Sequence, residues 1–309
     1  MQPEAVDPDV RLAAALRELP MLAGQPRQVE RVVGGLTNVN YKVTTPGLTA
    51  VVRLSSPDDD LLAIDRAAEH ENSRRAAASG AAPAVLAYLP DHRALAVEWV
   101  QGRTLAPADL RDESTLVQAA AACRLLHTGP RFVTDFDMPA TMARYLDIVQ
   151  ARGFRLPPRY LDLLPLMAKV GAALDVRRGT TVPCNNDLLA ANFVDDGERL
   201  WIIDYEYGGN NDAAFELGNL WSESNLSLDH LTLLVDSYAG RHLRHQVARA
   251  RLSGITAQYG WALWASIQQA VSPLDFDFWA WGMAKYDRAV EELDGPALEQ
   301  VLADAVRPD

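Results

Sequence analysis

Three polar residues in the second half of the chain have the types and spacing that phosphoryl transfer requires. Asp187 is followed five positions later by Asn192, and an apolar, strand-like run then ends at Asp204. One carboxylate can position a hydroxyl group and accept its proton, while an amide oxygen and a second carboxylate can hold Mg²⁺ against the phosphates of ATP. We therefore interpret Asp187 as the catalytic residue and Asn192 and Asp204 as the metal ligands.

The Asp-x-x-x-x-Asn spacing is that of a kinase catalytic loop, but the pattern by itself is weak. In the alternative interpretation, Asp187 and Asn192 are ordinary turn residues and Asp204 merely ends a strand. The apolar run 201–203 directly before Asp204 favours the catalytic interpretation, and so does the sheet-rich sequence upstream.

A glycine-containing turn and one basic residue in the first hundred residues are candidates for holding phosphates. Gly34 and Gly35 allow backbone N–H groups to approach a phosphate closely, although an ordinary hairpin turn has the same composition. Arg53 ends a strand-like run, and Glu69 on the next predicted helix can pair with it; both residues can equally be exposed surface charges. No Gly-Lys-Ser/Thr follows the glycines, so this segment is not a Walker A loop.

The elements that position these residues divide into a sheet-rich part and a helical part. Hairpin signals join the first strand-like runs, and helical spacing dominates after Gly102. We expect strands at 29–33, 41–44, 50–54, 84–88 and 94–100, a strand-like island at 182–205, and helices at 8–19, 64–79, 115–128, 139–151, 159–175, 228–242, 246–271 and 275–293. The fold class is thus α+β. A boundary near Glu98–Gly102 separates a nucleotide-binding lobe (residues 1–100) from a catalytic and substrate-binding lobe (residues 101–309).

Composition restricts the class of protein and its partners. The chain has 309 residues, 49% of them hydrophobic, and a formal net charge of −12. Such a negative surface repels nucleic-acid phosphates and anionic membranes, and it attracts cations. We find no membrane-spanning apolar run and no signal peptide, and two cysteines imply no disulfide framework. We therefore expect a cytoplasmic protein that neither binds nucleic acid nor inserts into a membrane.

Together these motifs resemble the choline/ethanolamine kinase branch of the aminoglycoside phosphotransferase-like kinases, over residues 29–290. The segment 34–41 resembles the nucleotide loop of that branch, 52–54 its third strand, and 98–102 the hinge that contacts adenine. The segments 186–192 and 203–207 match its catalytic and metal motifs. The resemblance implies a two-lobed protein-kinase-like fold that uses ATP and Mg²⁺. It also implies a set of nucleotide-binding positions: Gly34, Gly35, Leu36, Thr37, Asn38, Arg53, Glu69, Glu98 and Val100.

Aromatic residues near the C-terminus indicate the kind of alcohol that is phosphorylated. Trp261 and Trp264 are three positions apart and share one helix face, so they either belong to the core or surround a bound ammonium group. In choline kinases the cationic head lies among aromatic rings after the metal aspartate and on two C-terminal helices. The matching positions here are Tyr207, Trp261, Trp264 and Trp281, with Glu223 as the acidic residue. The resemblance therefore favours a small cationic alcohol, with choline or ethanolamine as the best candidates.

One position departs from the family pattern. The family reads His-Asn-Asp at the catalytic loop, whereas this chain reads Asn185-Asn186-Asp187. The histidine usually braces the loop through hydrogen bonds, which asparagine can supply without the packing of the ring. Slower turnover is compatible with this change, and so is an impaired pseudokinase that binds nucleotide. A kinase for an aminoglycoside, a sugar or another amino alcohol is the other alternative.

Overall fold

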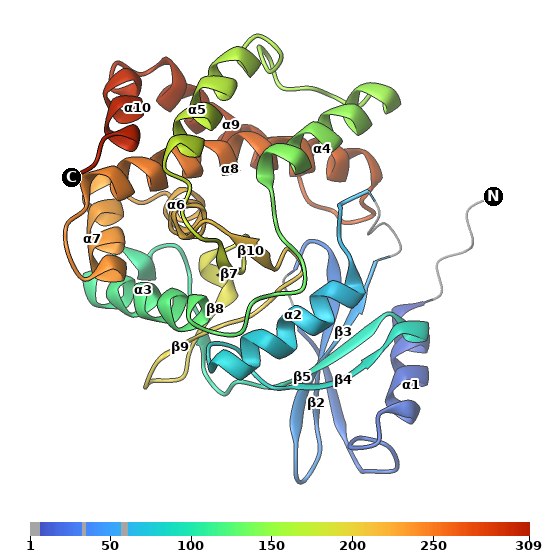
Figure 1. Ribbon diagram of the computed structural model, residues 1–309. Helices are drawn as coiled ribbons and strands as arrows, with labels where there is room; N and C mark the ends of the chain where they lie inside the picture. The colour runs from blue at the N-terminus through green and yellow to red at the C-terminus, as the bar shows by residue number, and fades with distance from the viewer. Residues whose placement is uncertain (1–6, 33–34, 57–60) are drawn as a thin grey trace.

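A computed structural model describes residues 7–32, 35–56 and 61–309 (Figure 1). An antiparallel sheet of five strands, in the order β1-β2-β3-β5-β4, lies at one end of the molecule, and most of the helices pack together at the other. The strands are β1 (Gln28–Val32), β2 (Asn38–Thr44), β3 (Thr49–Ser55), β4 (Val85–Leu89) and β5 (Ala94–Glu98). The predicted α+β class, with a small sheet followed by a larger helical part, is confirmed.

Two helices accompany the sheet, and they differ in what they bury. α1 (Pro8–Glu18) packs Leu12 and Leu16 into an apolar core with β2 and β3. α2 (Arg66–Ser79) begins at the capping side chain of Asp65 and ends at Gly80, which has the left-handed conformation that glycine adopts freely. The residues that α2 buries are mainly polar, Glu69 among them. This helix therefore presents a carboxylate to the interior of the protein.

The helical part is organised around one long helix, α8 (Arg244–Val271). Helices α4, α6, α9 and α10 all pack against α8, and its middle is buried on every side. The helices of this part are α3 (Glu113–His127), α4 (Met138–Arg152), α5 (Leu164–Val176), α6 (Ala213–Glu223), α7 (Leu228–Ala239), α8, α9 (Phe278–Asp294) and α10 (Leu298–Val306). Because α6 and α9 both contact α8, residues far apart in the sequence meet beside it.

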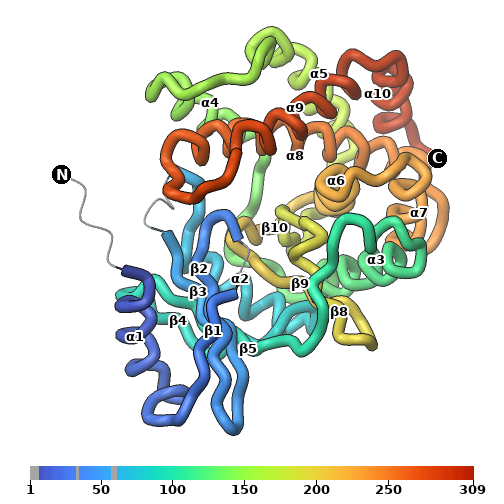
Figure 2. The backbone as a smooth tube through the Cα atoms, turned by 180° about the vertical axis from the view of Figure 1, so that it is seen from behind, coloured from blue at the N-terminus to red at the C-terminus, as the bar shows by residue number. Residues whose placement is uncertain are grey.

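Short strands lie between the large sheet and the helices (Figure 2). β6 (Arg103–Thr104), β8 (Phe193–Asp195) and β9 (Leu200–Ile202) form a three-stranded sheet, and β7 (Val182–Cys184) pairs with β10 (Gly209–Asn211). The 3₁₀ turns are η1 (Pro90–His92), η2 (Asp109–Arg111) and η3 (Ala190–Asn192). The predicted strand-like island at 182–205 therefore consists of β7, β8 and β9. Asp187 and Asn192 lie between β7 and β8, and Asp204 follows β9.

Three predicted helix boundaries are wrong by three residues or more. The helix expected at 275–293 begins only at Phe278, because the side chain of Asp277 caps it. The helix expected at 159–175 begins only at Leu164, because Arg159 has a positive φ of 61° and Pro165 occupies the first turn, where its missing N–H is tolerated. The helix expected at 228–242 ends at Ala239, because Gly240 adopts a left-handed C-cap. Among the described residues, no helix combines the length and apolar character needed to cross a membrane.

Candidate active site

The connection between β7 and η3 has an irregular backbone that buried side chains hold in place. Asn186 has a φ of 67° and Asp204 a φ of 64°, in the left-handed region that Asn and Asp tolerate better than most residues. The Asn186 side chain donates hydrogen bonds to three carbonyl oxygens, those of Cys184, Tyr207 and Gly209. These bonds connect the loop to the segment that follows Asp204.

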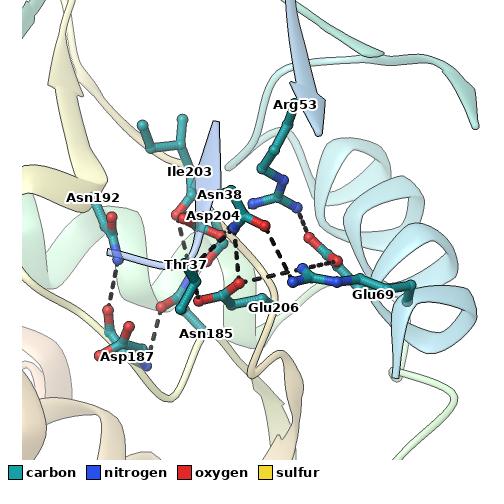
Figure 3. A network of polar contacts seen from close by, with 11 residues as sticks. Thr37, Asn38, Arg53, Glu69, Asn185, Asp187, Asn192, Ile203, Asp204 and Glu206 are labelled. Atoms are coloured by element: carbon teal, nitrogen blue, oxygen red, sulfur yellow. Dashed lines mark hydrogen bonds and ion pairs between the residues drawn. The ribbon is translucent and has the colours of Figure 1, made fainter. Parts of the chain in front are cut away.

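Asn185 is fully buried, and its side chain joins the loop that carries Asp187 to the end of the segment that carries Asp204 (Figure 3). Its Nδ2 donates to the carbonyl oxygens of Ile203 and Asp204, at 3.2 and 2.7 Å. Its Oδ1 accepts the backbone N–H of Asp187 at 3.1 Å. The asparagine thus makes bracing hydrogen bonds at the position where the sequence departs from the family histidine.

We expect Asn185→Ala to lower kcat by about 10- to 100-fold, as is typical when a residue that orients a catalytic or metal-binding group is lost. The carbonyl oxygens of Ile203 and Asp204 also lose a buried donor, which lowers the free energy of unfolding by about 1–3 kcal/mol. Steady-state kinetics and thermal denaturation measure the two effects separately.

Asn210→Ala is a matched control for this prediction. Asn210 is also buried, and its side chain bonds backbone groups of Phe132 and Thr134, away from Asp187. This variant is expected to lose a similar amount of stability and little kcat. An unchanged kcat in Asn185→Ala, or equal losses of kcat in both variants, would show that Asn185 does not position the site.

Glu216, in α6, supports the same loop from the interior, although the sequence indicated no role for it. Its two oxygens accept the backbone N–H groups of Asn185 and Asn186, each at 2.7 Å. His127 Nε2 lies 3.8 Å from Glu216 Oε1 and 3.6 Å from the sulfur of Cys184. Burial raises the pKa of the Cys184 thiol well above its ordinary value, and both Glu216 oxygens are engaged. His127, Cys184 and Glu216 lie close enough together to hold a metal ion. Because Glu216 already binds two backbone N–H groups, we interpret the three residues as structural support for the loop.

Asp204, Arg53 and Glu69 form a chain of charged groups between β9 and α2 (Figure 3). The Arg53 guanidinium, on β3, makes ion pairs with both Asp204 and Glu69. Arg53 and Glu69 are buried, so the interpretation that makes them exposed surface charges is wrong. Buried guanidinium groups need such partners, because an unpaired charge in the interior is costly.

The side-chain oxygen atoms of Asn192 and Asp204 have the chemistry of a Mg²⁺ site. Asn192 Nδ2 donates to the backbone carbonyl of Asp187 at 2.7 Å, so the amide donor is used and the amide oxygen remains as a ligand. The Asp204 carboxylate is about one-third exposed, at 31%, and reaches solvent despite its ion pair with Arg53. A carboxylate and an amide oxygen are hard ligands of the kind that Mg²⁺ prefers, so the residues present fit this ion.

The loop before β2 is attached to the helical part through Glu206. Thr37 Oγ1 and Asn38 Nδ2 donate to the two Glu206 oxygens at 2.8 and 2.9 Å, and Arg66 lies 3.2 Å from the same carboxylate. Arg66 also pairs with Glu69 at 2.7 Å. The sequence motif 203–207 contains Glu206, but neither this motif nor the sequence of the loop predicts that Glu206 contacts Thr37 and Asn38.

A cleft between the sheet and the short strands includes two of the remaining predicted nucleotide positions in its lining. Glu98 and Val100 line this cleft together with Arg53 and Asp204. Gly35 has a φ of 96°, and the Leu36 carbonyl accepts a hydrogen bond from Gln268 of α8 at 3.2 Å. Gly34 lies outside the described residues. The cleft thus places apolar side chains next to the charged groups of Arg53 and Asp204.

The predicted substrate aromatics form one cluster at the meeting point of α8, α9 and the segment after β9. The ring centroids of Tyr207 and Trp261 are 5.0 Å apart, and those of Trp264 and Trp281 are 5.5 Å apart. Trp264 Nε1 donates to the Tyr207 hydroxyl at 2.9 Å, which joins the two pairs. Tyr207, Trp261 and Trp264 are buried, so their rings also belong to the core of this part.

Glu223, the predicted acidic partner, already has a cation. The Lys285 ammonium group makes an ion pair with Glu223 and lies 4.1 Å from the ring centroid of Trp281. No sequence motif singled out Lys285, although its position four residues after Trp281 on one helix face was a signal that could have found it.

The charges around Asp187 change its proton affinity. Burial raises the pKa of the Asp187 carboxyl well above its ordinary value, and the negative charges of Glu223, Glu206 and Asp204 raise it further. Lys285 acts in the opposite direction. Glu223 and Lys285 are therefore near enough to Asp187 to influence it. A carboxylate with a raised pKa is a stronger base toward a hydroxyl proton.

Comparisons with known proteins identify the family of this chain. Residues 29–234 match the model of the choline/ethanolamine kinase family. Ethanolamine kinase 2 of Rattus norvegicus is 26% identical over 324 residues, which cover 92% of this chain and 82% of the relative. Protein LicA of Haemophilus influenzae is 23% identical over 251 residues, which cover 77% and 72%.

Solved structures show the same fold. A choline/ethanolamine kinase family protein from Mesorhizobium loti has a TM-score of 0.84 at 30% identity, with 96% of this chain and 98% of that chain covered. Choline kinase LicA from Streptococcus pneumoniae, at 19% identity and covering 93% and 98%, has a TM-score of 0.77. The aminoglycoside phosphotransferase APH(4)-Ia, at 15% and covering 92% and 98%, has a TM-score of 0.64. The two-lobed protein-kinase-like fold is confirmed, and the chain belongs to the choline/ethanolamine kinase family of ATP-dependent small-molecule phosphotransferases.

Proposed function

We propose that this protein transfers the γ-phosphoryl group of ATP, with Mg²⁺, to the hydroxyl of a small cationic alcohol, choline or ethanolamine. The observation that carries this proposal is the cluster of Tyr207, Trp261, Trp264 and Trp281 with an acidic residue, close to Asp187. Aromatic faces attract an ammonium group by about 0.5–2 kcal/mol per contact. The ethanolamine and choline kinases among its relatives support the same substrate class.

Asp187 is the residue that we assign to the substrate hydroxyl. Its backbone is held on both sides, by Asn185 at the N–H and by Asn192 at the carbonyl oxygen. The carboxylate is thereby positioned while its oxygens stay available to orient the hydroxyl and accept its proton. Its raised pKa suits this role.

The nucleotide occupies the cleft between the lobes in this proposal. Glu98 and Val100 contact adenine, and Arg53, oriented by Glu69, holds the phosphates. Backbone groups of 34–38 cover the phosphates, and Thr37 and Asn38 anchor that loop to Glu206. The boundary between the two lobes near Glu98–Gly102 stays a prediction, and so does the cytoplasmic location of the protein.

Asn192 and Asp204 are the residues that would hold Mg²⁺. When bound, the ion neutralises phosphate oxygens and stabilises the charge that develops during transfer. Before nucleotide binds, Arg53 supplies the positive charge next to Asp204 and keeps its partly exposed carboxylate in place.

The test is ADP release by purified protein, with and without Mg²⁺, in the presence of choline, ethanolamine or an aminoglycoside. We expect Mg²⁺-dependent release that choline or ethanolamine stimulates. Stimulation by the aminoglycoside alone would contradict the proposed substrate class. ATP binding without release in any mixture would point to the pseudokinase alternative.

A further inference from the structure

Lys285 occupies part of the place where a substrate cation would be expected. It follows Trp281 by one helical turn on α9, and its ammonium group lies between the face of that ring and the carboxylate of Glu223, the last residue of α6. The side chains of Lys285 and Glu223 are only 4% and 1% exposed. An internal cation therefore already uses one aromatic face and one carboxylate oxygen.

The other oxygen of Glu223 has a different environment. Lys285 pairs with Oε2, whereas Oε1 is buried and has no hydrogen-bond partner among the described residues. A buried acceptor without a donor is unfavourable, and a ligand that supplies an N–H group removes that penalty.

Aromatic residues connect this ion pair to the loop that carries Asp187. Trp281 packs on Trp264, whose Nε1 donates to the Tyr207 hydroxyl. The Tyr207 carbonyl in turn accepts a hydrogen bond from Asn186, the neighbour of Asp187.

The ion pair between Lys285 and Glu223 also removes the charge attraction that would bind a quaternary ammonium group. The charges of Lys285 and Glu223 cancel, so a trimethylammonium group meets a neutral ion pair and a ring face that is already in use. Such a group has no N–H and leaves Oε1 unpaired. An ammonium group that keeps at least one N–H can donate to Oε1.

We propose that Lys285 and Glu223 together select alcohols whose ammonium group carries an N–H, and that Lys285 disfavours quaternary ammonium alcohols. This inference rests on the proposed function and narrows its substrate class. It assigns to Lys285 a role in specificity, which acts through the free oxygen of Glu223 and the occupied face of Trp281.

A methylation series tests the proposal with the unmodified protein. Ethanolamine and its N-methyl, N,N-dimethyl and N,N,N-trimethyl derivatives, the last of which is choline, carry three, two, one and no N–H groups in their cationic forms. We expect the largest single fall in kcat/KM, about 10- to 100-fold, at the last methyl group, where the final donor to Oε1 is lost. Equal or greater kcat/KM for choline than for the dimethyl compound would overturn the proposal and leave the proposed function intact.

Variants of Lys285 separate selectivity from folding. Lys285→Ala frees both Glu223 oxygens and the Trp281 face, so the ratio of kcat/KM for choline to that for ethanolamine should rise by at least about tenfold. Lys285→Arg keeps the cation and should retain the wild-type order of the series. Lys169→Ala, at an exposed position of α5, is the control. It should change neither the ratio of kcat/KM for choline to that for ethanolamine nor the melting temperature.

Each outcome of these experiments bears on the proposal. An unchanged ratio in a folded Lys285→Ala protein that still binds ATP would contradict the role of Lys285. If that variant does not fold, the methylation series on the wild-type protein decides alone. If no member of the series stimulates ADP release, the proposed function fails and this inference fails with it.

Discussion

Asp187→Asn is expected to lower kcat by about 10²- to 10⁴-fold, the range over which a positioned general base accelerates a reaction. Asparagine cannot take the hydroxyl proton, but the backbone bonds from Asn185 and Asn192 do not depend on the carboxylate. The wild-type carboxylate is also crowded by other negative groups, which raise its pKa. The melting temperature of the variant should therefore equal or exceed that of the wild type at neutral pH.

This combination of lost activity and retained stability distinguishes a catalytic residue from a structural one. Binding of a non-hydrolysable ATP analogue should change little, because Asp187 contacts the acceptor in our proposal. Asp162→Asn, at an exposed position, is the matched control and should keep both activity and stability. Wild-type kcat in Asp187→Asn would reject the assignment of Asp187.

Asp204→Asn is expected to lower kcat by about 10³-fold and to raise the Mg²⁺ concentration needed for half-maximal rate. The variant loses the carboxylate that we assign to the ion, and several kcal/mol of charge stabilisation correspond to about three orders of magnitude in rate. It also loses the ion pair with Arg53, but Arg53 keeps Glu69 as a partner, so the sheet and α2 should stay folded.

Titration of the initial rate with Mg²⁺ and thermal denaturation measure these effects. Asp147→Asn, which changes an exposed aspartate on α4, is the control and should show the wild-type Mg²⁺ dependence. A normal Mg²⁺ dependence in a folded Asp204→Asn protein would mean that another residue holds the ion. A variant that unfolds would instead assign Asp204 mainly to the Arg53–Glu69 chain.

Local signals in the sequence predicted the elements and the contacts between residues close in the chain. Asp187 and Asn192 are five positions apart, and the structure joins them directly through the Asn192 side chain. Strand periods and hairpin turns predicted five strands, and the pairs β1–β2, β2–β3 and β4–β5 form through short connections. The pairing of β3 with β5, which joins them into one sheet, has no local signal. Helix ends were less certain, since caps such as Gly240 compete with a helical pattern that continues past them.

Tertiary packing alone decided how the charges are shared. Glu223 and Lys285 are 62 residues apart, and they meet only because α6 and α9 both pack on α8. Glu206 likewise meets Thr37 across 169 residues. Sequence by itself determined which residue types this protein has for the proposed phosphoryl transfer and cation binding. Which oxygen of Glu223 lacks a hydrogen-bond partner depends on where α9 places Lys285, and no local pattern encodes the separation of these two helices.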